Sequence, residues 1–148
     1  MSSGDENPDL DVGDGAPVDF ERLSVIAERL GTDARFTRID ESPPTAPERL
    51  VCVFDPALYP VSVEEARLDV AWFQNETFSI HYHESHVESE FDHRWDRHPS
   101  THNALDHIHP GPDAPTPGDD AHHPADWRDV LTTVLNEIED RQRGFWTD

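Results

Sequence analysis

Two stretches of the chain space their apolar residues about 3.6 positions apart, as amphipathic helices do. The first follows the potential helix cap Asp19 and stops near Gly31, with an apolar stripe of Phe20, Leu23, Ile26, Ala27 and Leu30. The second opens at Pro124, is expected to fray between Arg141 and Gly144, and carries Trp127, Val130, Leu131, Val134, Leu135 and Ile138. We interpret this second stripe as a core face that packs on a sheet.

Between these helices the pattern changes to short alternating or continuous apolar runs, which indicate strands. The predicted strands cover residues 34–39, 50–54, 66–73, 77–84 and 87–95. They predict an α+β fold, with an antiparallel sheet of about five strands, the C-terminal helix packed on one face and the short N-terminal helix nearby.

The register of one hairpin follows from burial. A three-residue loop at 74–76 pairs Trp72 with Phe78, Val70 with Ile80 and Leu68 with Tyr82, whereas a slip of one residue would scramble this apolar face. The opposite face then sets Asp69 against His81 and Arg67 against His83. A tight turn at 85–86 would continue the sheet, with Val87, Phe91 and Trp95 on the core side, and with Glu90 opposite His81 and Glu88 opposite His83.

Composition makes this a strongly acidic chain. Its 148 residues include 32 Asp and Glu against 11 basic residues, all of them arginine, for a formal charge of −21. In about 1 M salt the Debye length is only about 3 Å, so such a surface barely repels itself. We interpret the chain as a folded haloarchaeal protein that needs molar salt. The acidity argues against membrane surfaces and indiscriminate DNA binding, but a local arginine-lined site for RNA stays open.

The terminal segments and the single cysteine indicate the domain bounds and the cellular compartment. Residues 1–17 are predicted to be a disordered acidic segment that precedes a single domain over residues 18–146. Without a signal-peptide pattern or a long apolar run, we expect a cytoplasmic protein with no membrane partner. Cys52 lies inside an apolar run, which favours a buried filler over a nucleophile.

The chemistry is concentrated between His93 and His109, where five of the ten histidines fall within seventeen residues. Imidazole exchanges protons near neutral pH and also ligates metals. The metal signal is weak, because the chain has no HExxH or CxxC motif, and we expect no cofactor and no metal. Residues 97–123 form a long connection rich in Pro, Asp and His. We interpret its first half as a functional loop and its second half as a mobile surface loop.

Metal-free RNA cleavage needs a base, an acid and a cation that stabilises the charged phosphorane, and two histidines with an arginine meet that need. The predicted catalytic residues are His98, His107 and His109, with Asp96 or Asp106 orienting an imidazole. The predicted substrate-binding residues are Arg94, Arg97, His81, His83 and His102. Two alternatives use the same face: a non-enzymatic metal- or ligand-binding domain, and a plain protein-interaction domain.

A succession of short motifs resembles the TumE-type toxins of archaeal and bacterial toxin–antitoxin pairs. The motifs are Tyr82-His83, Arg94-Trp95-Asp96, His98-Pro99 and the pair His107 and His109, and the resemblance spans roughly residues 66–140. It implies a toxin component, a cognate antitoxin as partner, and RNA cleavage or RNA binding as the activity. This chain departs from the family pattern at Ile108, which is not basic, and at Arg97-His98, where the family has Asn after Asp96. No counterpart is placed for the first 60 residues.

Overall fold

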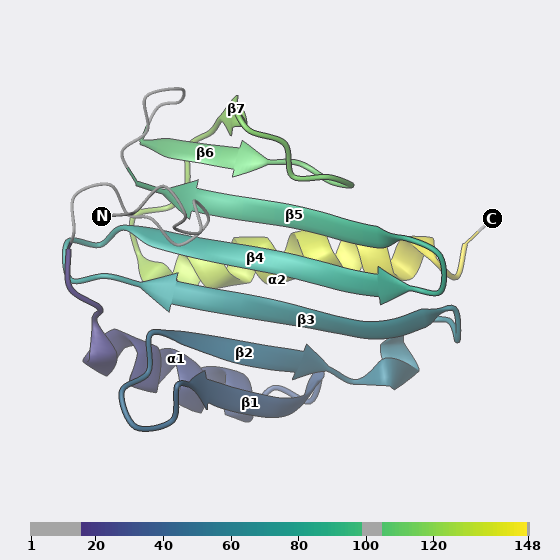
Figure 1. Ribbon diagram of the computed structural model, residues 1–148, viewed down its shortest axis with the longest axis horizontal. Helices are drawn as coiled ribbons and strands as arrows, with labels where there is room; N and C mark the ends of the chain where they lie inside the picture. The colour runs from purple at the N-terminus through teal and green to yellow at the C-terminus, as the bar shows by residue number, and fades with distance from the viewer. Residues whose placement is uncertain (1–15, 99–104, 148) are drawn as a thin grey trace.

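The computed structural model describes residues 16–98 and 105–147. Its central element is one antiparallel sheet. Seven strands follow one another in chain order, each paired antiparallel with the next (Figure 1). They are β1 Phe36–Ser42, β2 Arg49–Phe54, β3 Val63–Trp72, β4 Phe78–His86, β5 Glu90–Arg97, β6 Asp106–His109 and β7 Asp119–Asp120. The predicted α+β class is confirmed, although the sheet has seven strands instead of about five.

Two helices and one short 3₁₀ turn accompany the sheet. Helix α1 covers Phe20–Gly31, and its cap is Asp19, whose carboxylate accepts the backbone N–H of Arg22 at 2.9 Å. Helix α2 covers Trp127–Gly144. It begins after Asp126 and not at Pro124, and the carboxylate of Asp126 caps it by accepting the backbone N–H of Arg128. The expected fraying between Arg141 and Gly144 is not seen, because the helix continues to Gly144. The 3₁₀ turn η1, Pro56–Leu58, links β2 to β3.

Both helices lie on the same face of the sheet (Figure 1), and the hydrophobic core fills the space between them. All six apolar residues of the predicted α2 stripe are buried, whereas Phe20 of the predicted α1 stripe is exposed. Trp72 stacks on Phe78 with ring centroids 4.6 Å apart. None of the described helices is long and apolar enough to cross a membrane.

The other side of β3 to β6 is called the open face here, because neither helix of the described residues covers it (Figure 1). Side chains alternate along a strand, so the neighbours of the core residues point to this face. The open face carries Arg67, Asp69, His81, His83, Asp92, Arg94, Asp96, His107 and His109.

The register of the β3–β4 hairpin is as predicted. Trp72 pairs with Phe78, Asp69 with His81, and Arg67 with His83. The backbone N–H of Phe73 donates to the carbonyl of Thr77 at 3.0 Å and closes the three-residue loop. Burial of the apolar face was therefore sufficient to fix this pairing.

The predicted pairing of β4 with β5 is wrong by four residues. Strand β4 runs on to His86, whose N–H donates to the carbonyl of Ser89, so the turn lies later than predicted and Val87 is exposed in it. His81 consequently faces Arg94, and His83 faces Asp92. Because the shift is even, acids and histidines still meet on the open face, but with different partners.

The long connection predicted over residues 97–123 contains two strands. Strand β6 pairs with β5, so that Asp96 lies opposite His107 and Arg94 opposite His109. The paired histidines thus lie on a sheet strand and not on a loop, and β7 adds a short edge beyond them. Most of the predicted disordered N-terminal segment, and residues 99–104, lie outside the described residues.

Candidate functional site

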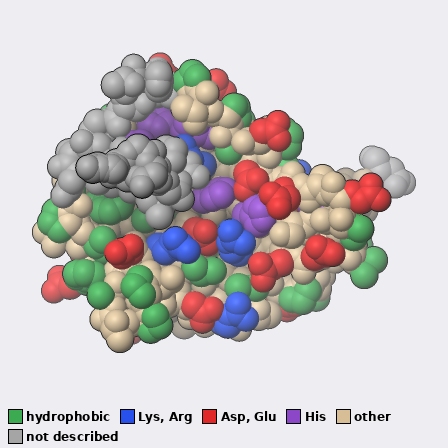
Figure 2. Space-filling model, in the orientation of Figure 1, with side chains coloured by type: hydrophobic (Ala, Val, Ile, Leu, Met, Phe, Trp, Pro, Cys, Tyr) green, Lys and Arg blue, Asp and Glu red, His purple; other side chains and the backbone are tan. Residues whose placement is uncertain are grey.

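Two carboxylates on the open face are each approached by histidines. The outer cluster consists of Asp92 from β5 with His81 and His83 from β4. The inner cluster consists of Arg94, Asp96, His98, His107 and His109, from β5, β6 and the residue after β5. Figure 2 shows histidine side chains on this face, with arginine and acidic side chains around them.

The outer cluster has the geometry of hydrogen bonds. Nε2 of His81 lies 2.8 Å from Asp92 Oδ1, and Nδ1 of His83 lies 2.7 Å from the same oxygen. The two rings are bound through different nitrogens, so His81 keeps Nδ1 and His83 keeps Nε2 for other contacts. Nε2 of His83 is 3.2 Å from the Ser85 hydroxyl. The His81 side chain is 24% exposed, as is that of Asp92, whereas His83 is buried, with 11% of its side chain exposed.

The inner cluster is arranged around one oxygen of a carboxylate that is 0% exposed. Nε2 atoms of three histidines approach Asp96 Oδ2, at 3.2 Å from His109, 3.4 Å from His98 and 3.5 Å from His107. Arg94 Nε donates to the same oxygen at 2.8 Å. All five side chains are buried, His107 with 1% exposure.

The charges of this cluster favour an ionised Asp96. Burial on its own would raise the pKa of Asp96, because a buried carboxylate loses its hydration. The imidazoles of His107, His109 and His98 and the charge of Arg94 outweigh that cost and hold the pKa well below its usual range. A buried anion beside an arginine is therefore the fixed centre of the cluster.

The inner cluster brings together five of the nine residues predicted for the site, namely Asp96, His98, His107, His109 and Arg94. Arg97 is elsewhere: its side chain is on the helix side of the sheet, where it binds Asp106 at 2.7 Å and the carbonyls of His123 and Pro124. His102 lies outside the described residues.

Asp92 is the residue of the outer cluster that sequence reasoning left out of the predicted site. The predicted register set Glu88 against His83, whereas Asp92 takes that place in the sheet. A turn placed two residues later, which moves every pairing partner by four, would have found it, because Asp92 shares the parity of His81 and His83 across the pair of strands.

Comparison with known families bears directly on these strands. The family model described as Toxin TumE matches residues 24–142, which is most of the chain and includes both clusters. The chain belongs to the TumE toxin family. It is therefore a toxin component, a class of protein that acts with a cognate antitoxin. No curated protein and no solved structure matches the chain.

The TumE match is wider than the resemblance seen in the motifs alone. It begins at residue 24, within α1, so part of the first 60 residues has a counterpart in the family after all. The motif residues divide between the two sides of the sheet. His83, Asp96 and His107 face the open side, whereas Tyr82 and Trp95 are buried in the core against the helices.

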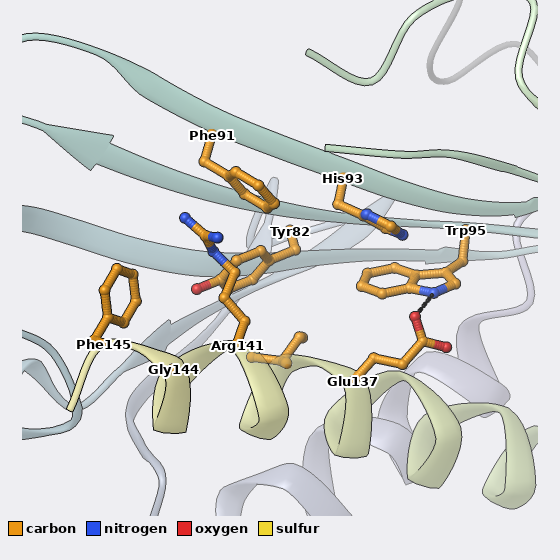
Figure 3. A pocket seen from close by; sticks show the side chains of 9 residues that line it. Tyr82, Phe91, His93, Trp95, Glu137, Arg141, Gly144 and Phe145 are labelled. Atoms are coloured by element: carbon orange, nitrogen blue, oxygen red, sulfur yellow. Dashed lines mark hydrogen bonds between the residues drawn. The ribbon is translucent and has the colours of Figure 1, made fainter. Parts of the chain in front are cut away.

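A pocket of about 540 Å³ lies on the helix side, between α2 and the strands β4 and β5 (Figure 3). Its walls are mainly aromatic. Of its polar groups, Trp95 Nε1 donates to Glu137 at 3.2 Å, and Arg141 donates to the neighbouring Glu84 at 2.7 Å. Burial lowers the pKa of His93, which also lines it, to about 4. In this TumE chain the aromatic pocket therefore lies on the helix side of the sheet, whereas both histidine clusters lie on the open face.

Metal ligands are available in both clusters. Among the described residues, two groups place three ligand-type atoms within 4.8 Å of one another. One is the outer cluster, and the other is Asp96 with His98 and His107. Histidine nitrogen with carboxylate oxygen is a donor set that suits zinc and related ions.

Proposed function

We propose that this toxin cleaves RNA by acid–base catalysis on the open face, and that the outer cluster supplies the acid and the base. One observation carries the proposal: His81 and His83 are both held by Asp92, at 2.8 and 2.7 Å, and the side chains of His81 and Asp92 are partly exposed. A carboxylate that accepts one ring N–H fixes the orientation of the imidazole and stabilises its protonated form.

The reaction needs two proton transfers. One neutral imidazole takes the proton of the ribose 2′-hydroxyl, and the 2′-oxygen forms a bond to phosphorus. The P–O5′ bond breaks, and the other imidazole, in its protonated form, gives a proton to the leaving 5′-oxygen. The products are a 2′,3′-cyclic phosphate and a free 5′-hydroxyl. The ring centroids of His81 and His83 are 6.2 Å apart, which leaves room for a phosphate to approach both rings.

Burial is the reason for choosing the outer cluster. The side chains of His98, His107 and His109, predicted as catalytic from the sequence, are 10%, 1% and 3% exposed. In the outer cluster the side chains of His81 and Asp92 are each 24% exposed, and a phosphodiester must touch its catalytic groups. Arg94, predicted to bind phosphate, is also buried and donates to Asp96. Arg67 lies opposite His83 in the sheet with a third of its side chain exposed, and we assign the phosphate contact to it.

The test is cleavage of a short RNA by purified protein in molar KCl. His81→Ala and His83→Ala should each lower the rate by about 10²–10⁴, the usual worth of one general acid or base. His122→Ala is the matched control, because His122 is exposed and belongs to neither cluster. Cleavage at the parent rate in both the His81 and the His83 variants would overturn the proposal. So would products that lack the cyclic phosphate.

A further inference from the structure

The inner cluster gathers three imidazoles and the guanidinium of Arg94 around one oxygen, Asp96 Oδ2. His109 is nearly fully buried, and its Nδ1 lies 2.6 Å from the carbonyl oxygen of Pro115. A carbonyl oxygen only accepts, so the proton of a neutral His109 ring is on Nδ1. Nε2 then carries a lone pair, and it faces Asp96 Oδ2 at 3.2 Å. With a neutral ring, two acceptors therefore face each other in a buried site, where a proton or a metal ion between them is favourable.

The remaining contacts of Asp96 leave it able to bind such a cation. Oδ1 of Asp96 is buried and has no hydrogen-bond partner, and Nε2 of His109 likewise makes no directed hydrogen bond. Buried polar atoms in native proteins are usually satisfied, and an exception calls for an unplaced water or ion. A carboxylate has lone pairs enough to accept from Arg94 and to ligate an ion as well.

The spacing of the ligand atoms agrees with a metal. Zinc binds histidine nitrogen and carboxylate oxygen at about 2.0–2.2 Å in a tetrahedron, so neighbouring ligand atoms lie about 3.4 Å apart. The three Nε2 atoms lie 3.2, 3.4 and 3.5 Å from Asp96 Oδ2, and the ligand atoms of Asp96, His98 and His107 all lie within 4.8 Å of one another. By contrast, the nitrogens of the outer cluster lie at 2.7–2.8 Å from Asp92, the distance of a hydrogen bond.

We propose that the inner cluster is a binding site for a divalent transition metal of the zinc class. Asp96, His98 and His107 are its ligands, because their ligand atoms lie within 4.8 Å of one another, and His109, 3.2 Å from Asp96, completes the set. Three imidazoles and one carboxylate suit zinc and disfavour magnesium and calcium, which prefer oxygen. The contact of His109 Nδ1 with the Pro115 carbonyl is the outer hydrogen bond that metal-binding histidines usually make.

Four protein ligands fill a tetrahedral site, so the metal has a structural role and fastens β5 to β6. The inference is independent of RNA cleavage. Binding should stabilise the folded chain, because the site is not formed in the unfolded one.

The experiment uses the full chain without a histidine tag, stripped with EDTA and then dialysed against Zn²⁺ or Co²⁺ in molar KCl. About one equivalent of zinc should remain bound after free metal is removed. Bound Co²⁺ should give the intense visible absorption of a four-coordinate ion. His98→Ala and His107→Ala should lose both signals, while Asp92→Asn, the same kind of carboxylate in the outer cluster, should keep them.

Failure to bind zinc or cobalt in the parent protein overturns the proposal, and so does retention of both ions by the His98 and His107 variants. Loss of binding in Asp92→Asn moves the site to the outer cluster and also overturns it. If the inner variants do not fold, the stoichiometry and the Co²⁺ spectrum of the parent decide alone. A protein that binds one zinc but leaves RNA intact would contradict only the proposed function, and the reverse result would contradict only the metal site.

Discussion

The two clusters on the open face use the same kinds of residue in different surroundings. Each has an aspartate of β5 with histidines from a neighbouring strand, and Arg94 lies between them in the sheet. Around Asp92 the contacts are short and the side chains of His81 and Asp92 are partly exposed, whereas around Asp96 the histidine contacts are longer and every side chain is buried. Accessibility therefore separates a site that can exchange protons with a substrate from one that can only hold a charge or an ion.

The largest expected effect concerns the outer aspartate. Asp92→Asn should lower RNA cleavage by about 10²–10⁴, because the amide no longer orients and charge-stabilises both imidazoles. Stability should change by about 1 kcal/mol or less, since these ion pairs are partly exposed. Cleavage rates and urea unfolding, both in molar KCl, measure the two quantities. An Asp92→Asn variant that loses much stability as well as cleavage rate would remove the distinction between the clusters.

The inner aspartate should show the opposite balance. Asp96→Asn leaves Arg94 buried without its anionic partner, and breaking such a pair costs about 3–5 kcal/mol. Urea unfolding of the variant gives this difference, with Asp40→Asn as control, because Asp40 pairs with Arg38 on the surface. A loss as small as that of the control would mean that Asp96 does not organise the inner cluster.

His93, which lies on the helix side and outside both clusters, should make the stability of the fold depend on pH. Burial, followed by the charge of Arg141, lowers the pKa of His93 to about 4 from an ordinary 6.5. Between these values the unfolded chain binds a proton that the folded chain does not. His93 therefore reduces stability as the pH falls from 6.5 to 4, by about 1–2 kcal/mol after allowance for its partial exposure.

Unfolding free energies measured from pH 7 to pH 4 test this expectation. His93→Phe should flatten the curve in that window and leave RNA cleavage at neutral pH unchanged. The depressed pKa of Glu84, which is buried but bonded to Arg141, adds a further loss of stability at still lower pH. An unchanged slope in the His93 variant would assign the pH dependence to other groups.

The smallest effect is expected at Cys52. Its side chain is buried, and burial raises the pKa of the thiol, so it is neither a nucleophile nor a metal ligand. Cys52→Ala should cost about 1 kcal/mol in stability and leave both metal content and cleavage unchanged. A folded variant without activity would show that chemistry extends beyond the two clusters.

Local patterns in the sequence determined the parts of this protein that depend on near neighbours. The apolar stripe of α2, the β3–β4 register and the burial of Cys52 could all be predicted, because periodicity and a short loop leave few alternatives. The density of histidines likewise marked the segment that forms the inner cluster. Its motifs resembled the TumE family, which the family match confirms.

Only the tertiary structure decided how those histidines are used. A turn two residues later than predicted placed Asp92 beside His81 and His83, and the return of the chain as β6 placed His107 and His109 beside β5. The short polar strand β6 has no apolar alternation of its own, so pairing with β5, a long-range contact, defines it. The exposure of a side chain also depends on the whole fold. It is exposure that distinguishes the outer cluster, which is partly accessible, from the inner cluster, which is closed.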